Sequence, residues 1–216
     1  MADLPMPAEG TVFLLDDEPG MLRALTRLLK AEGYPVRAFT TAKAFLESYH
    51  PQALGCLVLD VAMPEIDGLD LQRRLTRSGR LLPIVFLTGQ GDIPMSVQAI
   101  KAGAEDFLTK PVNDADLLRA VRAAMQRAAV QRELIAEAAL FHRRYSALTA
   151  REREVMAHIV AGELNKVAAA QLGVGEHTIK VHRARVMEKM GVESLADLVR
   201  AAERLSLVTH ANPNKD

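Results

Sequence analysis

The fold of this chain is decided by the stretch Thr11-Val-Phe-Leu-Leu-Asp-Asp-Glu18, in which an apolar run ends directly in three acidic residues. The run has no polar alternation, which is expected of a strand covered on both faces of a parallel sheet. The pattern recurs at Cys56–Asp60, which ends in an aspartate, and at Ile84–Thr88, which ends in a threonine. These runs predict an open parallel sheet with its ligand site at the carboxyl ends of the strands.

Five strands are predicted in the N-terminal half, and segments with apolar residues at helical spacing lie between them. The other two strands are Pro35–Phe39 and Asp106–Thr109. Gly33, Gly79 and Gly103 follow three of the helical segments, as glycine commonly does where a helix ends. An α/β fold with helices on both faces of the sheet is therefore expected. The apolar positions of the helical segments are Met21, Leu22, Leu25, Leu28, Leu29, then Ala42, Phe45, Leu46, Tyr49, then Leu69, Leu71, Leu75, and finally Val97 and Ile100.

A long helix is predicted after the last strand, because neither glycine nor proline occurs between Pro111 and Gly162. It begins at Asp114 and extends to about Leu140. The second half carries a thin apolar stripe, which suits a linker or a dimer seam; a solvated surface helix is the alternative. The stripe consists of Ala128, Ile135 and Ala138 or Ala139.

The remainder of the chain is predicted to be all-α, as a compact domain of four helices. Thr149 followed by Glu152 has the spacing of a capping box at the start of the first helix. The turn Gly173-Val174-Gly175 lies between the second and third helices, as in a helix-turn-helix. The predicted helices are Ala150–Val160, Asn165–Leu172, Glu176–Met190 and Ser194–Arg204.

Composition limits the class of protein. The chain has 216 residues, of which 49% are hydrophobic and 25% charged, as in a globular protein of two small domains. No apolar run is long enough for a membrane span, and the N-terminus lacks a signal core, so a cytoplasmic location is expected. The lone Cys56 excludes an internal disulfide framework. Residues 1–141 carry a net charge of −3 and residues 142–216 of +3, which suits an acidic domain joined to one that binds nucleic acid.

Acidic residues follow two of the predicted strands. If these strands are neighbours, Asp16, Asp17, Glu18 and Asp60 converge, and such carboxylates suit Mg²⁺. Thr88 adds a hydroxyl and Lys110 an ammonium group, which together provide the parts needed to hold a phosphoryl group. A carboxylate can itself accept that group as an aspartyl phosphate. Taken singly, each residue has an ordinary alternative as a helix cap, a turn residue or a surface charge.

The third C-terminal helix is predicted to be basic on its outer face. Lys180, Arg183 and Lys189 lie there, and His182 and Arg185 extend the face. A basic amphipathic helix after a glycine turn suits a recognition helix in the major groove of DNA; a solvated basic face is the alternative. The expected inner surface consists of Val167, Ala168, Leu172, Val174, Ile179, Val186 and Met190.

Four motifs resemble those of a CheY-like response-regulator receiver domain, over about Thr11 to Gln126. They are Leu-Leu-Asp16-Asp17-Glu, Leu-Asp60-Val-Ala-Met63-Pro64-Glu-Ile-Asp67-Gly68, Leu-Thr88-Gly and Phe107-Leu-Thr-Lys110-Pro111. The resemblance implies a doubly wound, flavodoxin-like sheet of order 2-1-3-4-5. It also implies that Asp60 is the phospho-acceptor and that Mg²⁺ is the cofactor. The metal ligands would be Asp17 directly, Asp16 through water, Asp60, and the backbone carbonyl of Ala62.

The same resemblance assigns the residues that respond to phosphorylation. Lys110 would pair with the phosphoryl group and precede a cis peptide to Pro111, and Thr88 with Phe107 would form the switch pair. Ala62 is a departure, since many relatives carry a polar side chain there, and this affects the lifetime of the phosphoryl group.

Residues from about Tyr145 to Leu207 resemble the LuxR/FixJ-type helix-turn-helix, so the whole chain is similar to a FixJ-type regulator. The resemblance places Asn165 and Lys166 near the DNA backbone and Thr178 at the start of the recognition helix. Lys180, Val181 and Ala184 would face the bases. Because Ala184 is short, Arg183 or Arg185 is expected to make more of the contacts, and His182, on the same basic face, is also expected to contact DNA.

The expected function is that of a two-component response regulator, not an enzyme. Residues 10–126 would form the receiver, 127–144 a helical linker, and 145–208 the DNA-binding domain. The expected partners are a sensor histidine kinase, double-stranded DNA, RNA polymerase and, on phosphorylation, a second copy of the chain; no membrane is involved. One alternative is a dehalogenase-type phosphatase, which usually needs a second carboxylate where this chain has Ala62. Another is an interaction protein whose C-terminal helices bind protein.

Overall fold

The computed structural model describes residues 10–50, 53–64, 66–78, 82–89 and 93–210, with 93–95 and 204–210 described by their backbone alone. The chain divides into two compact units, Met1–Arg132 and Glu133–Asp216. Each unit has its own core and is considered by itself.

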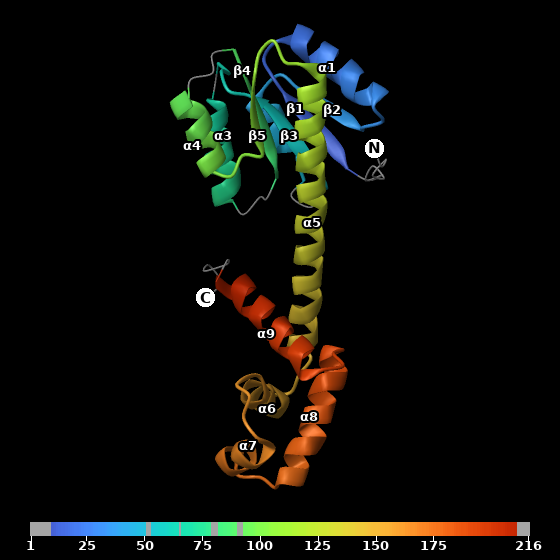
Figure 1. Cartoon of the computed structure of the whole chain (residues 1–216), viewed down its shortest axis with the longest axis vertical. Coiled ribbons are helices and arrows are strands. Elements are labelled where there is room, and N and C mark those ends of the chain that lie inside the picture. The colour runs from blue at the N-terminus through green and yellow to red at the C-terminus, as the bar shows by residue number, and fades with distance from the viewer. Residues whose placement is uncertain (1–9, 51–52, 65, 79–81, 90–92, 211–216) are drawn as a thin grey trace. The chain divides into compact units, whose positions relative to one another are not determined.

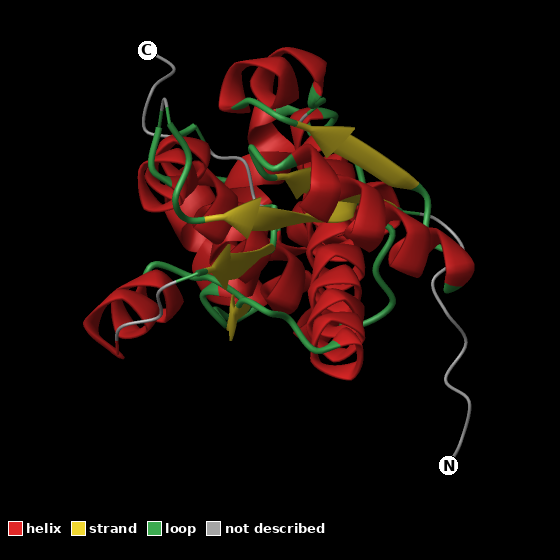
Figure 2. Cartoon of the chain, turned by 90° about the horizontal axis from the view of Figure 1, so that it is seen from above, coloured by secondary structure: helices red, strands yellow, loops and turns green. Residues whose placement is uncertain are grey.

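The first unit contains a five-stranded parallel sheet of order β2-β1-β3-β4-β5, so the predicted fold class is confirmed. Figure 2 shows the strands side by side, with helices on both faces. Three strands have the predicted bounds, and the other two differ by one residue at their start. The strands are β1 (Thr11–Leu15), β2 (Val36–Phe39), β3 (Gly55–Asp60), β4 (Ile84–Thr88) and β5 (Asp106–Thr109).

The absence of polar alternation in the central strands has a direct structural cause, because apolar cores lie on both faces of the sheet. Phe13 and Leu15 of β1 point into one core with α2 and α3, whereas Val12 and Leu14 point into the other with α1 and α5. The helices are α1 (Pro19–Ala31), α2 (Ala42–Ser48), α3 (Gly68–Arg77), α4 (Ile93–Lys101) and α5 (Asp114–Ser146), labelled in Figure 1.

Glycine ends two of these helices as predicted. Gly33 after α1 and Gly103 after α4 have φ of 85° and 94°, in the left-handed region that favours glycine. Gly79 lies outside the described residues. No helix in the described part of the chain is both long and apolar enough to cross a membrane.

Helix α5 is longer than predicted, with 33 residues that end at Ser146 instead of near Leu140. Asn113 caps its start, accepting a hydrogen bond from the backbone N–H of Ala115 at 2.9 Å. Burial along α5 stops at Ala128, and Ile135 in the predicted stripe is 55% exposed. Of the stripe, Ala128 is thus buried, whereas Ile135 is not part of either core.

The second unit contains the end of α5 and four further helices. They are α6 (Ala150–Val160), α7 (Asn165–Leu172), α8 (Glu176–Met190) and α9 (Leu195–His210). The first three have the predicted bounds, and α9 extends beyond the predicted Arg204. The expectation that Val167 lies on the inner surface is wrong, because its side chain is 41% exposed. The short α7 turns Ala168 and Ala169 inward instead. The fully or nearly buried core residues include Val155, Ile159, Ile179, Val186, Met190 and Leu198.

Candidate functional site

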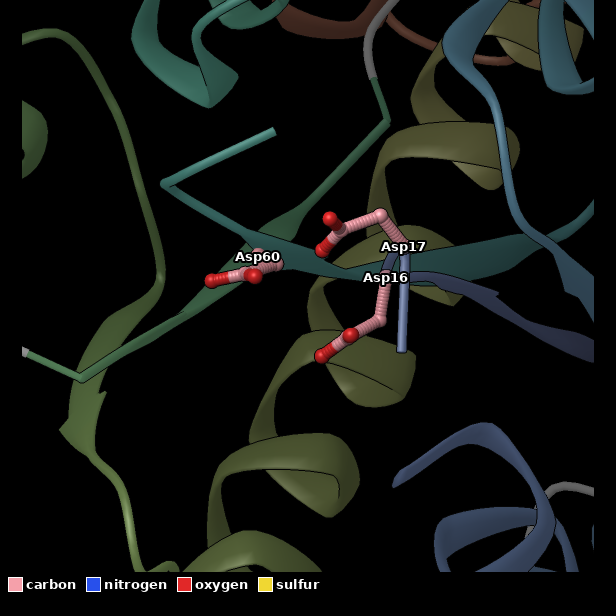
Figure 3. Close-up of side chains that lie close together, drawn as sticks. All are labelled: Asp16, Asp17 and Asp60. Atoms are coloured by element: carbon pink, nitrogen blue, oxygen red, sulfur yellow. The ribbon is translucent and has the colours of Figure 1, made fainter. Parts of the chain in front are cut away.

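Three aspartates meet at the carboxyl ends of β1 and β3. Leu15 and Leu59 are direct neighbours in the parallel ladder, so the residues that follow them, Asp16 and Asp60, end the strands at the same level. Asp17 comes next in the chain, and one carboxylate oxygen from each of the three aspartates lies within 4.8 Å of the other two. Figure 3 shows the three side chains at this edge of the sheet.

Burial makes this cluster electrostatically costly. Asp16 is 2% and Asp60 4% exposed, whereas Asp17 faces solvent. Carboxylates so close together repel unless a cation lies among them, and an all-oxygen donor set suits Mg²⁺. The donor set therefore fits the metal that the sequence predicts.

Lys110 supplies positive charge to the same site. Its Nζ donates a hydrogen bond to Asp16 Oδ2 at 2.8 Å and lies 3.1 Å from Asp60 Oδ2. The backbone N–H of Lys110 bonds to the carbonyl of Thr88 at 2.7 Å, which holds the residue beside the end of β4. The peptide bond from Lys110 to Pro111 is cis, as the resemblance implies.

The site perturbs two pKa values. Burial raises the pKa of Asp60, although its hydrogen bond with Lys110 works in the opposite direction. For Lys110, burial works to lower the pKa, but hydrogen bonds to Asp16 and Asp60 outweigh it, so the pKa lies above its usual value. The raised pKa of Lys110 favours its ammonium form, whose hydrogen bonds offset part of the cost of burying Asp60.

Of the other predicted receiver residues, Ala62 and Thr88 lie near Asp60, and Phe107 lies one strand farther away. The backbone N–H of Ala62 bonds to Asp60 Oδ1 at 3.4 Å, which places this backbone segment beside the carboxylate. Thr88 is buried at the end of β4, next to β3. Phe107 is half-buried on β5, with its ring centroid 6.1 Å from that of Phe86. The metal-binding and switch roles of these residues stay predictions.

The ordinary alternative of a helix cap does not account for Asp16. Glu18 occupies the cap position of α1, and its side chain makes no capping hydrogen bond. Asp16 Oδ1 accepts the backbone N–H of Glu18 at 2.8 Å, while Oδ2 faces Lys110. The side chain thus orders the loop after β1 and also contributes to the charged site.

The predicted DNA-contacting residues all lie on α7 and α8. Arg183 and Asn165 connect the two helices, with the guanidinium Nη1 donating to Asn165 Oδ1 at 3.5 Å. Lys180 is exposed, and its Nζ lies 3.6 Å from Glu176 Oε1 one turn earlier. Lys166, Thr178, Lys180, Val181 and Arg185 are exposed, whereas Asn165, His182 and Arg183 are half-buried.

Two expectations about the outer face of α8 need qualification. The placement of Lys189 on this face is wrong, because its Nζ bonds to Glu152 Oε2 of α6 at 2.6 Å. His182 is half-buried, and its Nδ1 has no hydrogen-bond partner among the described residues. The basic face available for a ligand therefore centres on Lys180 and Arg185, with Arg183 toward α7.

Sequence reasoning missed the connection between α6 and α8. Glu152 completes the predicted capping box, exchanging hydrogen bonds with Thr149. It is only 3% exposed, so its charge needs a partner, which Lys189 provides from 37 residues away. The capping signal indicated the acidic residue, but no local signal indicates the lysine.

We expect acid to weaken the second unit through Glu152. Its hydrogen bonds, first from Lys189 and then from Thr149, lower the pKa from 4.5 to about 2. A lowered pKa in the folded state stabilises the fold above pH 4.5, and this stabilisation is lost as the pH falls toward 2. Amide hydrogen exchange of α6 and α8, measured across this range, should show the loss in wild type and a flatter profile in Glu152→Gln. An equally steep profile in the variant would assign the acid sensitivity to other groups.

Both halves of the chain match known families. Residues 12–122 match the family described as response regulator receiver domain. Residues 146–202 match the family described as bacterial regulatory proteins, luxR family.

Curated relatives match along nearly the whole length. Response regulator protein TmoT of Ectopseudomonas mendocina is 46% identical over 197 residues, which are 91% of this chain and 90% of the relative. Transcriptional regulatory protein FixJ of Bradyrhizobium diazoefficiens is 38% identical over 203 residues, 94% of this chain and 99% of the relative.

Solved structures of response regulators also match along nearly the whole chain. The response regulator StyR is 42% identical, with a TM-score of 0.79, and the match covers 91% of this chain and 99% of that one. Full-length FixJ from B. japonicum is 38% identical, with a TM-score of 0.55, and covers 92% of this chain and 98% of that one.

Proposed function

Because the chain belongs to the response regulators that join a receiver domain to a LuxR-family DNA-binding domain, we propose that phosphorylation of Asp60 controls its binding to DNA. The family consists of two-component transcriptional regulators, not of enzymes in the usual sense. One observation carries the assignment of the acceptor: buried Asp60 lies at a strand end beside a second buried carboxylate and 3.1 Å from the Lys110 ammonium.

The proposed chemistry is transfer of a phosphoryl group from a phosphohistidine of a sensor kinase. The phosphorus–nitrogen bond breaks as an Asp60 carboxylate oxygen forms a bond to phosphorus. Lys110 would then neutralise part of the charge on the phosphoryl oxygens. Mg²⁺ would be held by Asp16, Asp17, Asp60 and the carbonyl of Ala62, and it supplies further positive charge at this place.

The proposed response passes through Thr88 and Phe107. The hydroxyl of Thr88, at the end of the strand beside Asp60, would be drawn toward the phosphoryl group, and the surface near Phe107 would change with it. The changed surface would favour a homodimer. We assign the receiver to residues 10–126, the linker to 127–144 and the DNA-binding domain to 145–208.

The proposed DNA contacts are assigned from which side chains of α7 and α8 are exposed. Lys180, Val181 and Arg185 would enter the major groove from α8, and Thr178 would lie at its start. Asn165, Lys166, His182 and Arg183 would lie toward the DNA backbone. The protein would act in the cytoplasm, where a dimer bound at its operator is within reach of RNA polymerase.

Lys110→Ala is expected to accept some phosphoryl group but to lose its coupling to dimerisation and DNA binding. The ammonium that links the phosphoryl group to the end of β5 is then absent, while the acceptor carboxylate remains. Light scattering and gel shifts, with and without acetyl phosphate and Mg²⁺, measure the two responses. Lys30→Ala, on the exposed last turn of α1, is the matched control.

Two results would contradict this proposal separately. Normal dimerisation of phosphorylated Lys110→Ala would remove the switching role of that lysine. Failure of phosphorylated wild type to shift genomic DNA fragments even at low salt would instead favour a C-terminal half that binds protein.

A further inference from the structure

Few of the described side chains of helix α4 are buried in the first unit. Of its described side chains, which are those of residues 96–101, only Ala99 is buried. Val97 is 44% and Ile100 47% exposed. Helices in proteins derive most of their stability from packing an apolar face, and over residues 96–101 the buried part of that face is the Ala99 methyl group. This stretch of the helix is therefore weakly held by apolar packing.

Gln72 of the neighbouring α3 reaches the last turn of α4. Its side chain is buried, at 3% exposed, and Nε2 donates to the carbonyls of Ala99 at 3.4 Å and Ala102 at 3.3 Å. Figure 1 shows α3 and α4 next to each other. The two carbonyls determine the orientation of the amide, since the reversed amide would set oxygen against oxygen.

Backbone hydrogen bonds also cap the C-terminal end of α4. The N–H groups of Gly103 and Ala104 bond to the carbonyls of Ile100 at 2.9 Å and Ala99 at 3.0 Å, and Gly103 has the positive φ that this turn requires. Ala104 is buried in the same core as Ala99. Hydrogen bonds and burial thus both hold the C-terminal end of the helix.

Packing stability does not explain a glutamine at position 72. Its Oε1 is buried and has no hydrogen-bond partner among the described groups, which costs free energy that an apolar side chain would not. What the amide provides, and an apolar residue does not, is a directed attachment to α4.

We propose that Gln72 is a positioning residue that anchors the C-terminal end of α4. The helix then pivots about this end when its N-terminal end, which follows Thr88 in the chain, moves. The anchoring is independent of phosphorylation, whereas the pivoting rests on the function proposed above. Movement at Thr88 then becomes a rotation that carries Val97 and Ile100, the exposed apolar residues of α4, to a new position.

The anchor is tested by hydrogen exchange in the unphosphorylated full-length protein. Gln72→Met keeps the length of the side chain and removes both the donor and the unsatisfied acceptor. The amides of Ala102, Gly103 and Ala104 should exchange about tenfold faster in this variant, as expected for the loss of two hydrogen bonds. Arg73→Met, on the exposed face of α3, is the matched control and should leave these amides unchanged. Gln72→Leu is a second variant that guards against an effect peculiar to methionine.

The pivot is tested by adding beryllofluoride and Mg²⁺ as a phosphoryl mimic. In wild type, exchange should change at the amides of residues 96–98 and stay constant at Ala102 to Ala104. In Gln72→Met the change should spread to the C-terminal amides, although acetyl phosphate labels Asp60 to the same extent.

Two outcomes would overturn the inference. Exchange in Gln72→Met identical to wild type would show that the amide anchors nothing. Equal changes at both ends of α4 in activated wild type would show that the helix does not pivot there. If wild type accepts no phosphoryl group, the proposed function fails and the pivot with it, while the unphosphorylated comparison still decides the anchor.

Discussion

Asp60→Asn is expected to abolish the incorporation of a phosphoryl group from acetyl phosphate in the presence of Mg²⁺. The amide has nearly the shape of the carboxylate but lacks its negative charge and its nucleophilic oxygen. Asp60 is buried, and its carboxylate already faces Lys110, so no other group can replace it without moving into this position. Intact mass spectrometry should show one added phosphoryl group in wild type, removed by hydroxylamine as an acyl phosphate would be, and none in the variant.

A matched control separates the loss of this carboxylate from the loss of any aspartate. Asp114→Asn changes an exposed aspartate at the start of α5 and should be labelled as wild type is. Undiminished, hydroxylamine-sensitive labelling of Asp60→Asn would refute the acceptor assignment. The acceptor would then be sought first at Asp16 and Asp17, whose carboxylates lie in the same cluster.

Lys180→Ala and Arg183→Ala should weaken DNA binding in different ways. Lys180 is exposed on α8, and loss of a base contact should cost roughly 1–3 kcal/mol on the specific site and little on random DNA. Arg183 leans toward Asn165 at the start of α7, so we expect it to contact phosphate. Its loss should weaken binding to all sequences and reduce the salt slope by about one.

Fluorescence anisotropy on specific and random duplexes at several salt concentrations distinguishes these two effects. The core of the second unit contains neither side chain, so circular dichroism should be unchanged in both variants. Arg143→Ala removes an exposed charge from the last turn of α5 and is the matched control. A variant that binds both duplexes as wild type does would identify its residue as surface charge.

Short-range patterns predicted the elements that position the site. The run Val12–Leu15 before Asp16 has no polar residue because both faces of β1 are covered. Consecutive residues alone are therefore enough to predict that the strand is buried on both faces. The capping box of Thr149 and Glu152 is likewise complete within one helical turn. The convergence of Asp16 with Asp60 followed once the strands were taken as neighbours, because parallel strands end at the same edge.

Other sequence predictions failed where burial depends on distant residues. Val167 has the chemistry of a core residue, but α7 presents Ala168 and Ala169 to the core instead. Lys189 is predicted on the outer side of α8 with Lys180, but nine residues at about 100° each bring it to the opposite side of the helix, where it reaches Glu152. Periodicity gives the angle of a residue around its helix, and it does not say which neighbour lies there.

What the sequence determined by itself is the order of strands and helices, the carboxyl ends of the strands, and the chemical nature of the residues at those ends. These features depend on a few consecutive residues and on backbone geometry. The tertiary structure alone decided two other pairings of buried polar groups. Lys189 reaches Glu152 across 37 residues, and Gln72 reaches Ala102 across 30. A buried polar group needs a partner, and only the packing of distant elements determines which partner lies within hydrogen-bonding distance.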